Sequence, residues 1–309
     1  MGKRSRSDKP TGEGSDARVP SARDALNAGA TRAPWLEKPA LGPESGGVRV
    51  LDEFDRFRGS NTTATLAFPQ RTRFVRVHLF GSDTLRCGRV PERNDVALVV
   101  LPLTAENHAL SMAISSQHFL VQLTPNGIEL QDTSKYGTSL NGQNVQGTAM
   151  IPLDQVSEVS VAVSLRLRLT PLINQPSASG RAIDPYLALG PADELWNTAA
   201  GLGLGGLFIE RVENLADVES YLMIFTWAAL GPAFDGEAGG PAIEGGRLRL
   251  VRRQGQFWLH NITAVGSATV AGVPLPVGFA CPLMPGLTLG VGKETVEFRE
   301  IEQFGIDAV

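Results

Sequence analysis

The chain has 309 residues, enough for about two domains, and is rich in glycine (34) and proline (20) but poor in aromatic residues (6%). This composition favours many short strands and turns over helices. The net charge of −4 gives no electrostatic reason to expect nucleic-acid or membrane-surface binding, and no apolar run reaches the ~20 residues of a membrane-spanning helix.

The two cysteines, Cys87 and Cys281, stand far apart, so no disulfide framework is expected and a reducing compartment fits. Basic residues at the N-terminus are not followed by an apolar segment, so we expect no export signal and a cytoplasmic protein. The four histidines show no metal-ligand spacing with one another or with the cysteines. The sequence therefore predicts no metal site and no cofactor.

Residues 1–60 mix charged residues with proline, glycine and serine and show no sustained hydrophobic period, which is typical of a disordered tail. The alternative is a docking segment that a kinase modifies. The threonines in or beside this segment that such a kinase would find are Thr11, Thr31, Thr62 and Thr63.

Residues 61–172 contain a series of strand-like segments separated by turns. Asn126-Gly127 indicates a hairpin turn, because this pair adopts positive φ at low cost. The last segment alternates so cleanly that it predicts one long half-buried strand, whereas Leu101–Met112 reads as a long loop beside the end of a strand. The expected strands are Thr65–Phe68, Phe74–Phe80, Val96–Val100, His118–Leu123, Ile128–Asp132 and Val159–Leu169.

Residues 173–204 are rich in proline, glycine and alanine, which favours a linker with one or two helical turns around Ala192–Trp196. Strand-like sequence resumes at Leu207–Val212 and Tyr221–Trp227. A further domain is therefore expected over 205–309.

Three short motifs stand in order within the first strand-rich region. They are Gly88-Arg89, Ser115–His118 and the run Asp132–Gly142, which reads Asp-Thr-Ser-Lys-Tyr-Gly-Thr-Ser-Leu-Asn-Gly. Together they resemble the forkhead-associated (FHA) domain, whose pattern is Gly-Arg, Ser-x-x-His and Asp-x-Ser-x-Asn-Gly-Thr-x-x-Asn-Gly. The resemblance implies a β-sandwich whose loops at one end bind phosphothreonine, and the composition suggests a bacterial member.

The resemblance implies separate roles for the residues of these motifs. Arg89 and Ser115 would contact the phosphate, the first through its planar guanidinium and the second through its hydroxyl. Ser116 and the loop pair Lys135 and Tyr136 would line the peptide site. The residues expected to hold the motif's architecture are Gly88, His118, Asp132, Gly137, Thr138, Asn141 and Gly142.

This sequence departs from the family pattern at several places. Lys135 stands where the family commonly has a hydroxyl residue, so it either supplies a point charge or faces solvent. Tyr136 replaces the asparagine that holds the bound peptide's backbone, and Ser116 replaces a common Arg, Lys or Asn. The interval from Arg89 to Ser115 exceeds the family's usual length by about ten residues, which either contact ligand or form an excursion at the strand end.

The second half of the chain can be aligned with the first. Gln256–Asn261 aligns with Gly127–Asp132, and Ala271-Gly272 aligns with Asn141-Gly142 after a one-residue insertion. We therefore predict a degenerate second copy over 205–309, the alternative being that any two antiparallel β domains align this well.

The aligned positions of the phosphate site differ in the second half. Pro232 and Glu244 stand where the first half has Arg89 and Ser115, so the second copy is not expected to bind phosphate. It would instead dimerise, hold a partner by shape or brace the first copy.

No catalytic residues are predicted. The sequence contains no Gly-x-Ser-x-Gly elbow, Walker loop or His-Glu-x-x-His motif, and the glycines of 201–206 lack the strand-to-helix context of a dinucleotide site. We therefore expect a non-enzymatic protein.

The sequence thus predicts an all-β protein with two FHA-like antiparallel β-sandwiches in tandem. Its expected parts are a disordered tail (1–60), a phosphopeptide-binding sandwich (61–172), a linker (173–204) and a degenerate sandwich (205–309). The resemblance implies an adaptor in serine/threonine kinase signalling, whose partners are phosphothreonine proteins and a kinase. The alternative is a structural scaffold in which both sandwiches make phosphate-independent contacts, for example in a secretion assembly. Homo-oligomerisation stays open.

Overall fold

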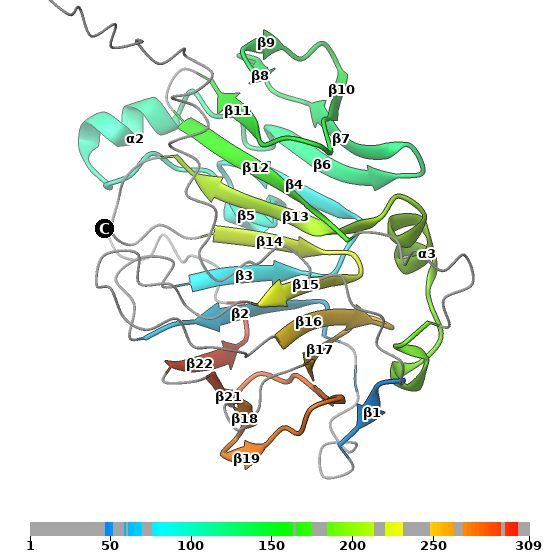
Figure 1. Ribbon diagram of the computed structural model, residues 1–309. Coiled ribbons are helices and arrows are strands. Elements are labelled where there is room, and N and C mark those ends of the chain that lie inside the picture. The colour runs from blue at the N-terminus through cyan, green and yellow to red at the C-terminus, as the bar shows by residue number, and fades with distance from the viewer. Residues whose placement is uncertain are drawn as a thin grey trace, which may run out of the picture. The chain divides into compact units, whose positions relative to one another are not determined.

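The structure is a computed structural model that describes residues 47–51, 59, 61–69, 76–162, 165–174, 184–212, 220–230, 248–262, 268–291 and 294–301. All of these residues belong to one compact unit, which spans 34–309. The described part is all-β apart from two α-helices and two short 3₁₀ turns (Figure 1), as the composition predicts. Neither described helix is long and apolar enough to cross a membrane.

The first five-stranded sheet of the described residues contains three strands that border the predicted motifs, β4 (Thr84–Gly88), β6 (Phe119–Thr124) and β7 (Gly127–Asp132). Its neighbours are antiparallel except at one edge, where the last two strands run parallel. In spatial order its strands are β10 (Thr148–Ile151), β7 (Gly127–Asp132), β6 (Phe119–Thr124), β4 (Thr84–Gly88) and β5 (Val96–Ala97).

The second five-stranded sheet of the described part comes mainly from the last third of the chain. Its outermost strand, β1, lies within the predicted disordered tail and pairs in parallel with β20, so that prediction is wrong for this segment. In spatial order the strands are β1 (Arg49–Val50), β20 (Phe279–Pro282), β17 (Gln256–Asn261), β16 (Leu248–Arg253) and β15 (Trp227–Leu230).

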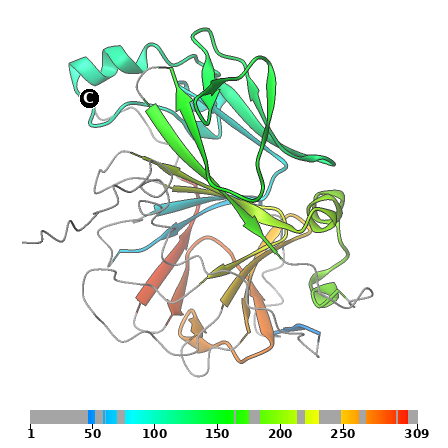
Figure 2. The ribbon, with the colours of Figure 1, turned by 45° about the horizontal axis from the view of Figure 1, so that its top comes forward.

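A twelve-stranded sheet, counted over the described residues, joins the two halves of the chain. Strands of the first half and of the last third lie at its two ends (Figure 2). In spatial order it contains β19 (Val273–Pro274), β18 (Ala268–Val270), β21 (Leu287–Val291), β22 (Glu294–Arg299), β2 (Thr63–Ala67), β3 (Arg76–Phe80), β14 (Ser220–Ile224), β13 (Leu204–Arg211), β12 (Leu165–Ile173), β11 (Ser157–Val161), β8 (Thr138–Leu140) and β9 (Gln143–Asn144).

One face of the long sheet packs against the first five-stranded sheet. Leu169, Ile209 and Tyr221 are paired neighbours on β12, β13 and β14, so their side chains point to the same face. All three are buried in one core with Leu85 of β4 and Val121 of β6. The core around the predicted motifs therefore contains side chains from strands on both sides of residue 172.

The opposite face of the long sheet packs against the second five-stranded sheet. Leu66 of β2 lies opposite Phe298 of β22, and both are buried. The Phe298 ring meets Phe257 of β17 edge-on, with 6.4 Å between the ring centroids. Leu66 lies opposite Val77 of β3, which pairs with Ser220 of β14, one position away from Tyr221. Because side chains alternate along a strand, the two five-stranded sheets cover opposite faces.

The single long strand predicted from Val159 to Leu169 is instead an antiparallel hairpin. Strand β11 ends at Val161, β12 begins at Leu165, and these two residues lie directly opposite each other. The alternation therefore stays in phase through the turn, and nothing in the apolar pattern marks the break. Ala162 in the turn has a φ of 50°, although it is not one of the residues that favour positive φ.

The loop predicted over Leu101–Met112 contains a helix, α2 (Ala105–Ser111), preceded by the 3₁₀ turn η2 (Pro91–Arg93) further upstream. The Thr104 hydroxyl accepts a hydrogen bond from the Asn107 amide, which caps the first turn. Thr104 is the sequence signal that could have revealed the helix. Leu103, Leu110 and Met112 stay exposed around it.

A second short helical region packs on the second sheet where a linker was predicted. It comprises η3 (Leu187–Leu189) and α3 (Glu194–Gly201), and Asp193 caps α3 by accepting from the Trp196 amide at 2.8 Å. Arg252 of β16 donates to both oxygens of the Asp193 carboxylate at 2.7 and 2.8 Å. Burial alone would raise the pKa of Asp193, but these hydrogen bonds and the nearby arginine charges lower it below its ordinary value.

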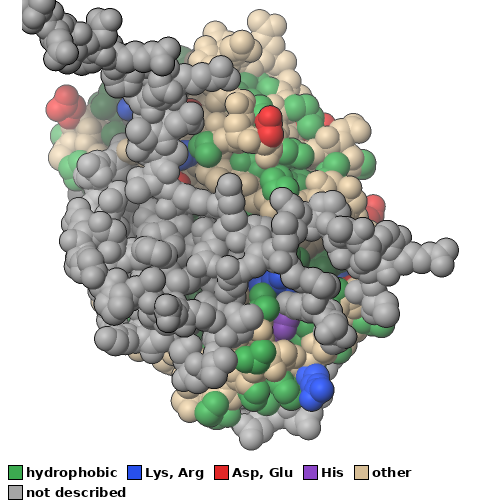
Figure 3. All heavy atoms as spheres, in the orientation of Figure 1, with side chains coloured by type: hydrophobic (Ala, Val, Ile, Leu, Met, Phe, Trp, Pro, Cys, Tyr) green, Lys and Arg blue, Asp and Glu red, His purple; other side chains and the backbone are tan. Residues whose placement is uncertain are grey.

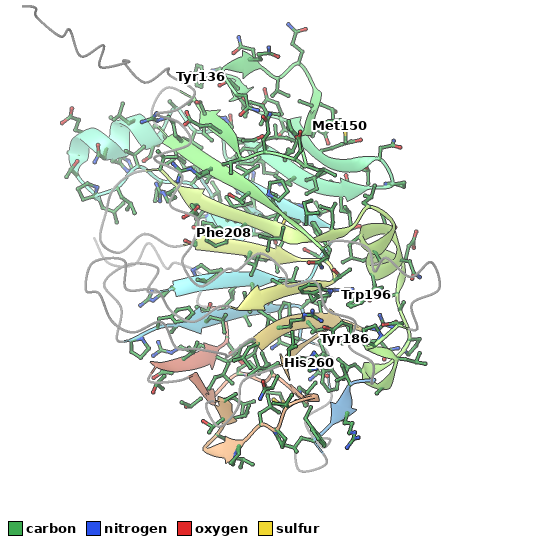
Figure 4. The ribbon with its side chains drawn as sticks, viewed as in Figure 1. Tyr136, Met150, Tyr186, Trp196, Phe208 and His260 are labelled. Atoms are coloured by element: carbon green, nitrogen blue, oxygen red, sulfur yellow. The ribbon has the colours of Figure 1, made fainter. Side chains whose placement is uncertain are left out.

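An aromatic cluster lies under this helical region. Tyr186 meets both Trp196 and His260 edge-on, with ring centroids 5.8 and 5.5 Å apart, and the three side chains lie together in Figure 4. Arg253 is buried, stacks on Trp196 and forms an ion pair with Asp184 at 2.5 Å. The Arg253–Asp184 ion pair, whose arginine is buried, differs from the described surface shown in Figure 3, where charged side chains are isolated among apolar and uncharged ones.

The close approach of β13 to β14 at Gly206 gives a first testable prediction. A Cβ atom added at Gly206 would lie 2.2 Å from the Met223 carbonyl oxygen, so Gly206→Ala must separate the two strands. We expect it to lower the free energy of unfolding by about 1–3 kcal/mol in urea titrations. Gly201→Ala is the matched control, because nothing lies within 4 Å of its added Cβ. Equal midpoints for the two variants would contradict the close pairing.

The buried histidine of the aromatic cluster gives a second prediction. Burial, together with the charge of Arg249, lowers the pKa of His260 from 6.5 to about 4. The unfolded chain therefore takes up a proton below pH 6.5 that the folded protein refuses until about pH 4, so stability is complete above pH 6.5 and falls through this window. We expect a loss of about 2 kcal/mol between pH 7 and pH 5 in chemical unfolding.

Two variants test the origin of this pH dependence. His260→Gln should flatten the profile between pH 7 and pH 5, whereas His108→Gln, at an exposed position on α2, should leave it as steep as before. A profile of unchanged slope in His260→Gln would show that other groups carry the effect.

Candidate functional site

The predicted site lies at the end of the first sheet where β4 ends and β6 begins. Gly88 closes β4, and a Cβ atom there would lie 2.4 Å from the Ser116 carbonyl oxygen and 2.8 Å from the Asn94 side chain. Only glycine fits this approach without displacing the backbone of the neighbouring loop. The Asn94 side-chain amide donates to the carbonyls of Val90 and Ser116, at 2.7 and 2.6 Å, and so ties the two loops together.

Arg89 lies directly beside Ser115. Its backbone amide donates to the Ser115 carbonyl at 3.0 Å, and its Nε donates to the Ile114 carbonyl at 3.1 Å. The second bond fixes the end of this half-buried side chain. The two terminal amino groups of the guanidinium have no hydrogen-bond partner among the described residues, so they can bind an anion.

Ser115 is positioned through both its backbone and its side chain. Its amide donates to Nδ1 of His118 at 3.0 Å, and its Oγ accepts from the Lys135 amide at 2.9 Å. A hydroxyl that accepts through one lone pair still has its proton to donate. Ser115 therefore keeps one neutral donor, in a residue whose backbone carbonyl bonds to the Arg89 amide.

His118 is a buried structural residue of this site. Burial lowers the pKa of its imidazole, although the Gly137 carbonyl and the charge of Asp132 act in the opposite direction. Nδ1 accepts from Ser115, which leaves the proton of the neutral ring on Nε2, 3.3 Å from the Gly137 carbonyl oxygen. The ring thus connects the Ser115 loop to the loop between β7 and β8.

Asp132 organises the loop between β7 and β8. Its Oδ1 accepts from the Ser134 amide at 2.9 Å and from the Thr138 hydroxyl at 2.8 Å, and the Gly137 amide donates to the Ser134 hydroxyl at 2.8 Å. Burial alone would raise the pKa of Asp132, but these hydrogen bonds and the nearby His118 lower it. Gly137 has a φ of 89°, which suits glycine alone.

Lys135 and Tyr136 form the tip of this loop, and both are exposed. Lys135 Nζ lies 5.3 Å from the centroid of the Tyr136 ring. Tyr136, labelled in Figure 4, is 61% exposed. Since Ser115 accepts from the Lys135 backbone, the Lys135 side chain starts beside the Ser115 hydroxyl. Ser116 is half-buried, and its carbonyl is the acceptor that binds Asn94.

Asn141 and Gly142 lie apart from the residues just described, in the turn between β8 and β9. Both have positive φ, 53° and 78°, and Asn141 Oδ1 accepts from the Glu158 amide at 2.8 Å. The structure therefore brings Arg89, Ser115 and the loop after Asp132 to one end of the sheet, whereas Asn141 and Gly142 shape the following turn. Asn94 was missed from the sequence, because Asn-Asp reads only as a turn.

The described residues contain no group of three or more His, Cys, Asp and Glu side chains placed to hold a metal ion. Pro232 and Glu244, which align with the residues predicted to contact phosphate, lie outside the described residues.

Comparisons with known proteins agree with the motifs. Residues 80–161 match the family model of the FHA domain. A search of the curated proteins found no match. Among solved structures, the FHA domain of the CT664 protein from Chlamydia trachomatis is 20% identical, with the match covering 34% of this chain and 95% of that one at a TM-score of 0.24.

Two further structures show the same kind of similarity. The FHA domain of an Arabidopsis thaliana hypothetical protein is 18% identical, covering 46% of this chain and 100% of that one at a TM-score of 0.26. Mycobacterium tuberculosis EmbR, in complex with a low-affinity phosphopeptide, is 16% identical, covering 38% of this chain and 25% of that one at a TM-score of 0.22.

The hydrogen bonds of Asp132 give a third prediction. Asp132→Ala removes the acceptor for Ser134 and Thr138, so we expect it to lower the free energy of unfolding by about 1–3 kcal/mol. Amide hydrogen exchange over 133–137 should become faster. Asp154→Ala, at an exposed position, should change neither quantity. An unchanged exchange rate over 133–137 in Asp132→Ala would contradict the role of Asp132 in the loop.

Proposed function

From the match of residues 80–161 to the FHA family model, we propose that the chain is a non-enzymatic adaptor that binds phosphothreonine peptides at the end of β4. Its partners are phosphothreonine proteins and the serine/threonine kinase that produces them. Arg89 and Ser115 contact the phosphate, and Ser116, Lys135 and Tyr136 line the peptide site.

The observation that carries the proposal is the contact between Arg89 and Ser115. The two residues are joined by a backbone hydrogen bond of 3.0 Å, and each keeps side-chain donors that have no hydrogen-bond partner among the described residues. Phosphothreonine presents nearly two negative charges and three acceptor oxygens at neutral pH. A guanidinium with two free amino groups and an adjacent hydroxyl match this ligand in both charge and hydrogen-bonding capacity.

The loop tip adds charge to the same end of the sheet. Lys135 replaces a neutral hydroxyl by an ammonium group, which attracts an anion but does not fix its orientation. Its backbone amide is already used by Ser115, so only the side chain is available to a ligand. Tyr136 offers an exposed ring against which the peptide chain can pack.

A second function, constitutive contact without phosphate, is favoured by one feature of the same loop. Tyr136 is a largely exposed aromatic residue where the family has the asparagine that holds the peptide backbone. Exposed aromatic residues are enriched in protein–protein interfaces. In this case the chain would be a scaffold in an assembly such as a secretion apparatus, and Arg89 would not contact a ligand.

Phosphopeptide binding by matched variants tests the proposal. A phosphothreonine peptide library should bind the full chain, and the same peptides without phosphate should not. Arg89→Ala removes the charge-assisted bonds, so we expect a dissociation constant at least about tenfold higher, equivalent to ~1.5–3 kcal/mol. Arg49→Ala, an exposed arginine on β1 of the other five-stranded sheet, should bind as the unaltered chain does.

The same measurement distinguishes the two functions. Equal binding of phosphorylated and plain peptides, with no loss of affinity in Arg89→Ala, would favour the scaffold and contradict the phosphopeptide proposal. Titration by isothermal calorimetry gives both the affinity and the number of sites. One site per chain is expected, because the second half lacks a counterpart of Arg89 in the sequence.

A further inference from the structure

The described strands of the two halves follow the same spatial order. In the five-stranded sheets, β10-β7-β6-β4 of one half corresponds to β20-β17-β16-β15 of the other. In the long sheet, β9-β8-β11-β12 at one end corresponds to β19-β18-β21-β22 at the other. In each half the chain passes through these strands in the same sequence.

The pairing register is also the same in both halves. The strand pairs within these two sets of four have counterparts whose facing residues occupy equivalent places. Leu85 faces Val121 as Ala228 faces Leu250, Phe119 faces Asp132 as Leu248 faces Asn261, and Val159 faces Leu167 as Leu289 faces Val296. Such agreement at several interfaces is more than a shared class of fold requires.

One turn repeats in its backbone detail. Ala271 and Gly272 have φ values of 49° and 79°, close to those of Asn141 and Gly142. The Ala271 amide donates to the Thr288 carbonyl, as the Asn141 amide donates to the Glu158 carbonyl. Alanine has no intrinsic preference for positive φ, so the conformation is set by the shared architecture of the two halves.

Two further hairpins correspond to each other, and each docks on the other half. In β2–β3, Thr63 faces Phe80, and in β13–β14, Gly206 faces Ile224. Strand β13 pairs with β12 of the first half, whereas β2 pairs with β22 of the second. The docking register agrees as well, since Ile209 faces Leu169 as Leu66 faces Phe298.

We infer that the two halves are copies of one sandwich that have exchanged their first hairpins. The sandwich that carries Arg89 and Ser115 then consists of residues 84–224 in one continuous segment, with its first two strands supplied at its C-terminal end. It is inserted between β3 and β15 of the second copy, which consists of 63–80 and 227–299. A boundary near residue 172 would cut the first sandwich between β12 and β13.

The junctions between the copies are short and held by buried contacts. Gly81 links β3 to β4, and its carbonyl accepts from Nε of Arg252 at 2.8 Å in a buried hydrogen bond. Thr226 links β14 to β15, and its hydroxyl accepts from the Asn174 side chain at 3.0 Å. Between the junctions, β3 and β14 pair in parallel, so each exchanged hairpin protects the exposed edge of the other.

Cysteine pairs in the full chain test the exchange without reference to ligand binding. Arg168 faces Glu210 across β12 and β13, and Ala67 faces Glu297 across β2 and β22, so Cα atoms at both places lie within disulfide range. We expect Arg168→Cys with Glu210→Cys, and Ala67→Cys with Glu297→Cys, to cross-link on mild oxidation. Arg168→Cys with Ala67→Cys should not.

A control pair makes the result decisive. Arg168→Cys with Glu158→Cys lies across the β11–β12 hairpin, which forms whether or not the hairpins are exchanged. Cross-linking of this control and of 168 with 67, but not of 168 with 210, would overturn the inference. Peptide mass mapping identifies each disulfide and excludes the native buried cysteines.

A matched pair of core variants gives an independent measurement. Ile209 and Leu66 occupy equivalent buried positions. Ile209→Ala should speed amide exchange most in β11 and β12, at least about tenfold, and Leu66→Ala should do so in β21 and β22. The reverse assignment would show that each copy keeps its own hairpin and would overturn the exchange.

Discussion

The pairing of β12 with β13 is the constraint on which the first sandwich depends. Strand β12 buries Leu165, Leu167 and Leu169 against the sheet that carries the motifs, and its other edge must find a partner for its backbone groups. Strand β13 supplies that partner, and Leu207 and Ile209 extend the same core. The end of β4, where Arg89 lies, is thus supported by residues more than a hundred positions further along the chain.

The central strands of the long sheet bury both faces because the two five-stranded sheets cover opposite sides. In β13 the residues Leu207, Phe208 and Ile209 are all buried, so the strand does not alternate. Phe208, labelled in Figure 4, points away from the core that contains its two neighbours. A continuous apolar run of this kind is typical of a strand covered on both sides.

Local chemistry explains which features could be predicted from the sequence. Gly88 is required by the close approach of the Ser116 carbonyl, Asp132 by a turn that needs a hydrogen-bond acceptor, and Gly137 by its positive φ. Each of these needs selects a recognisable residue type. The β11–β12 turn could not be recognised in the sequence, because the apolar alternation stays in phase across it. Strand pairing is not local either, since β2 and β13 both bury apolar residues and nothing in either sequence specifies whether it docks on β12 or on β22.

The backbone bonds of the proposed site explain how the side chains at its loop tip can change while its geometry stays fixed. The Ser115 hydroxyl accepts from the backbone of Lys135, and Arg89 donates from its own backbone to Ser115. Neither bond depends on the side chain at position 135 or 136, so substitution there changes the charge and shape offered to a ligand but leaves the loop intact. The departures at Lys135 and Tyr136 therefore bear on what the proposed site could bind, whereas the side chains of His118 and Asp132 make the bonds that hold its loops together.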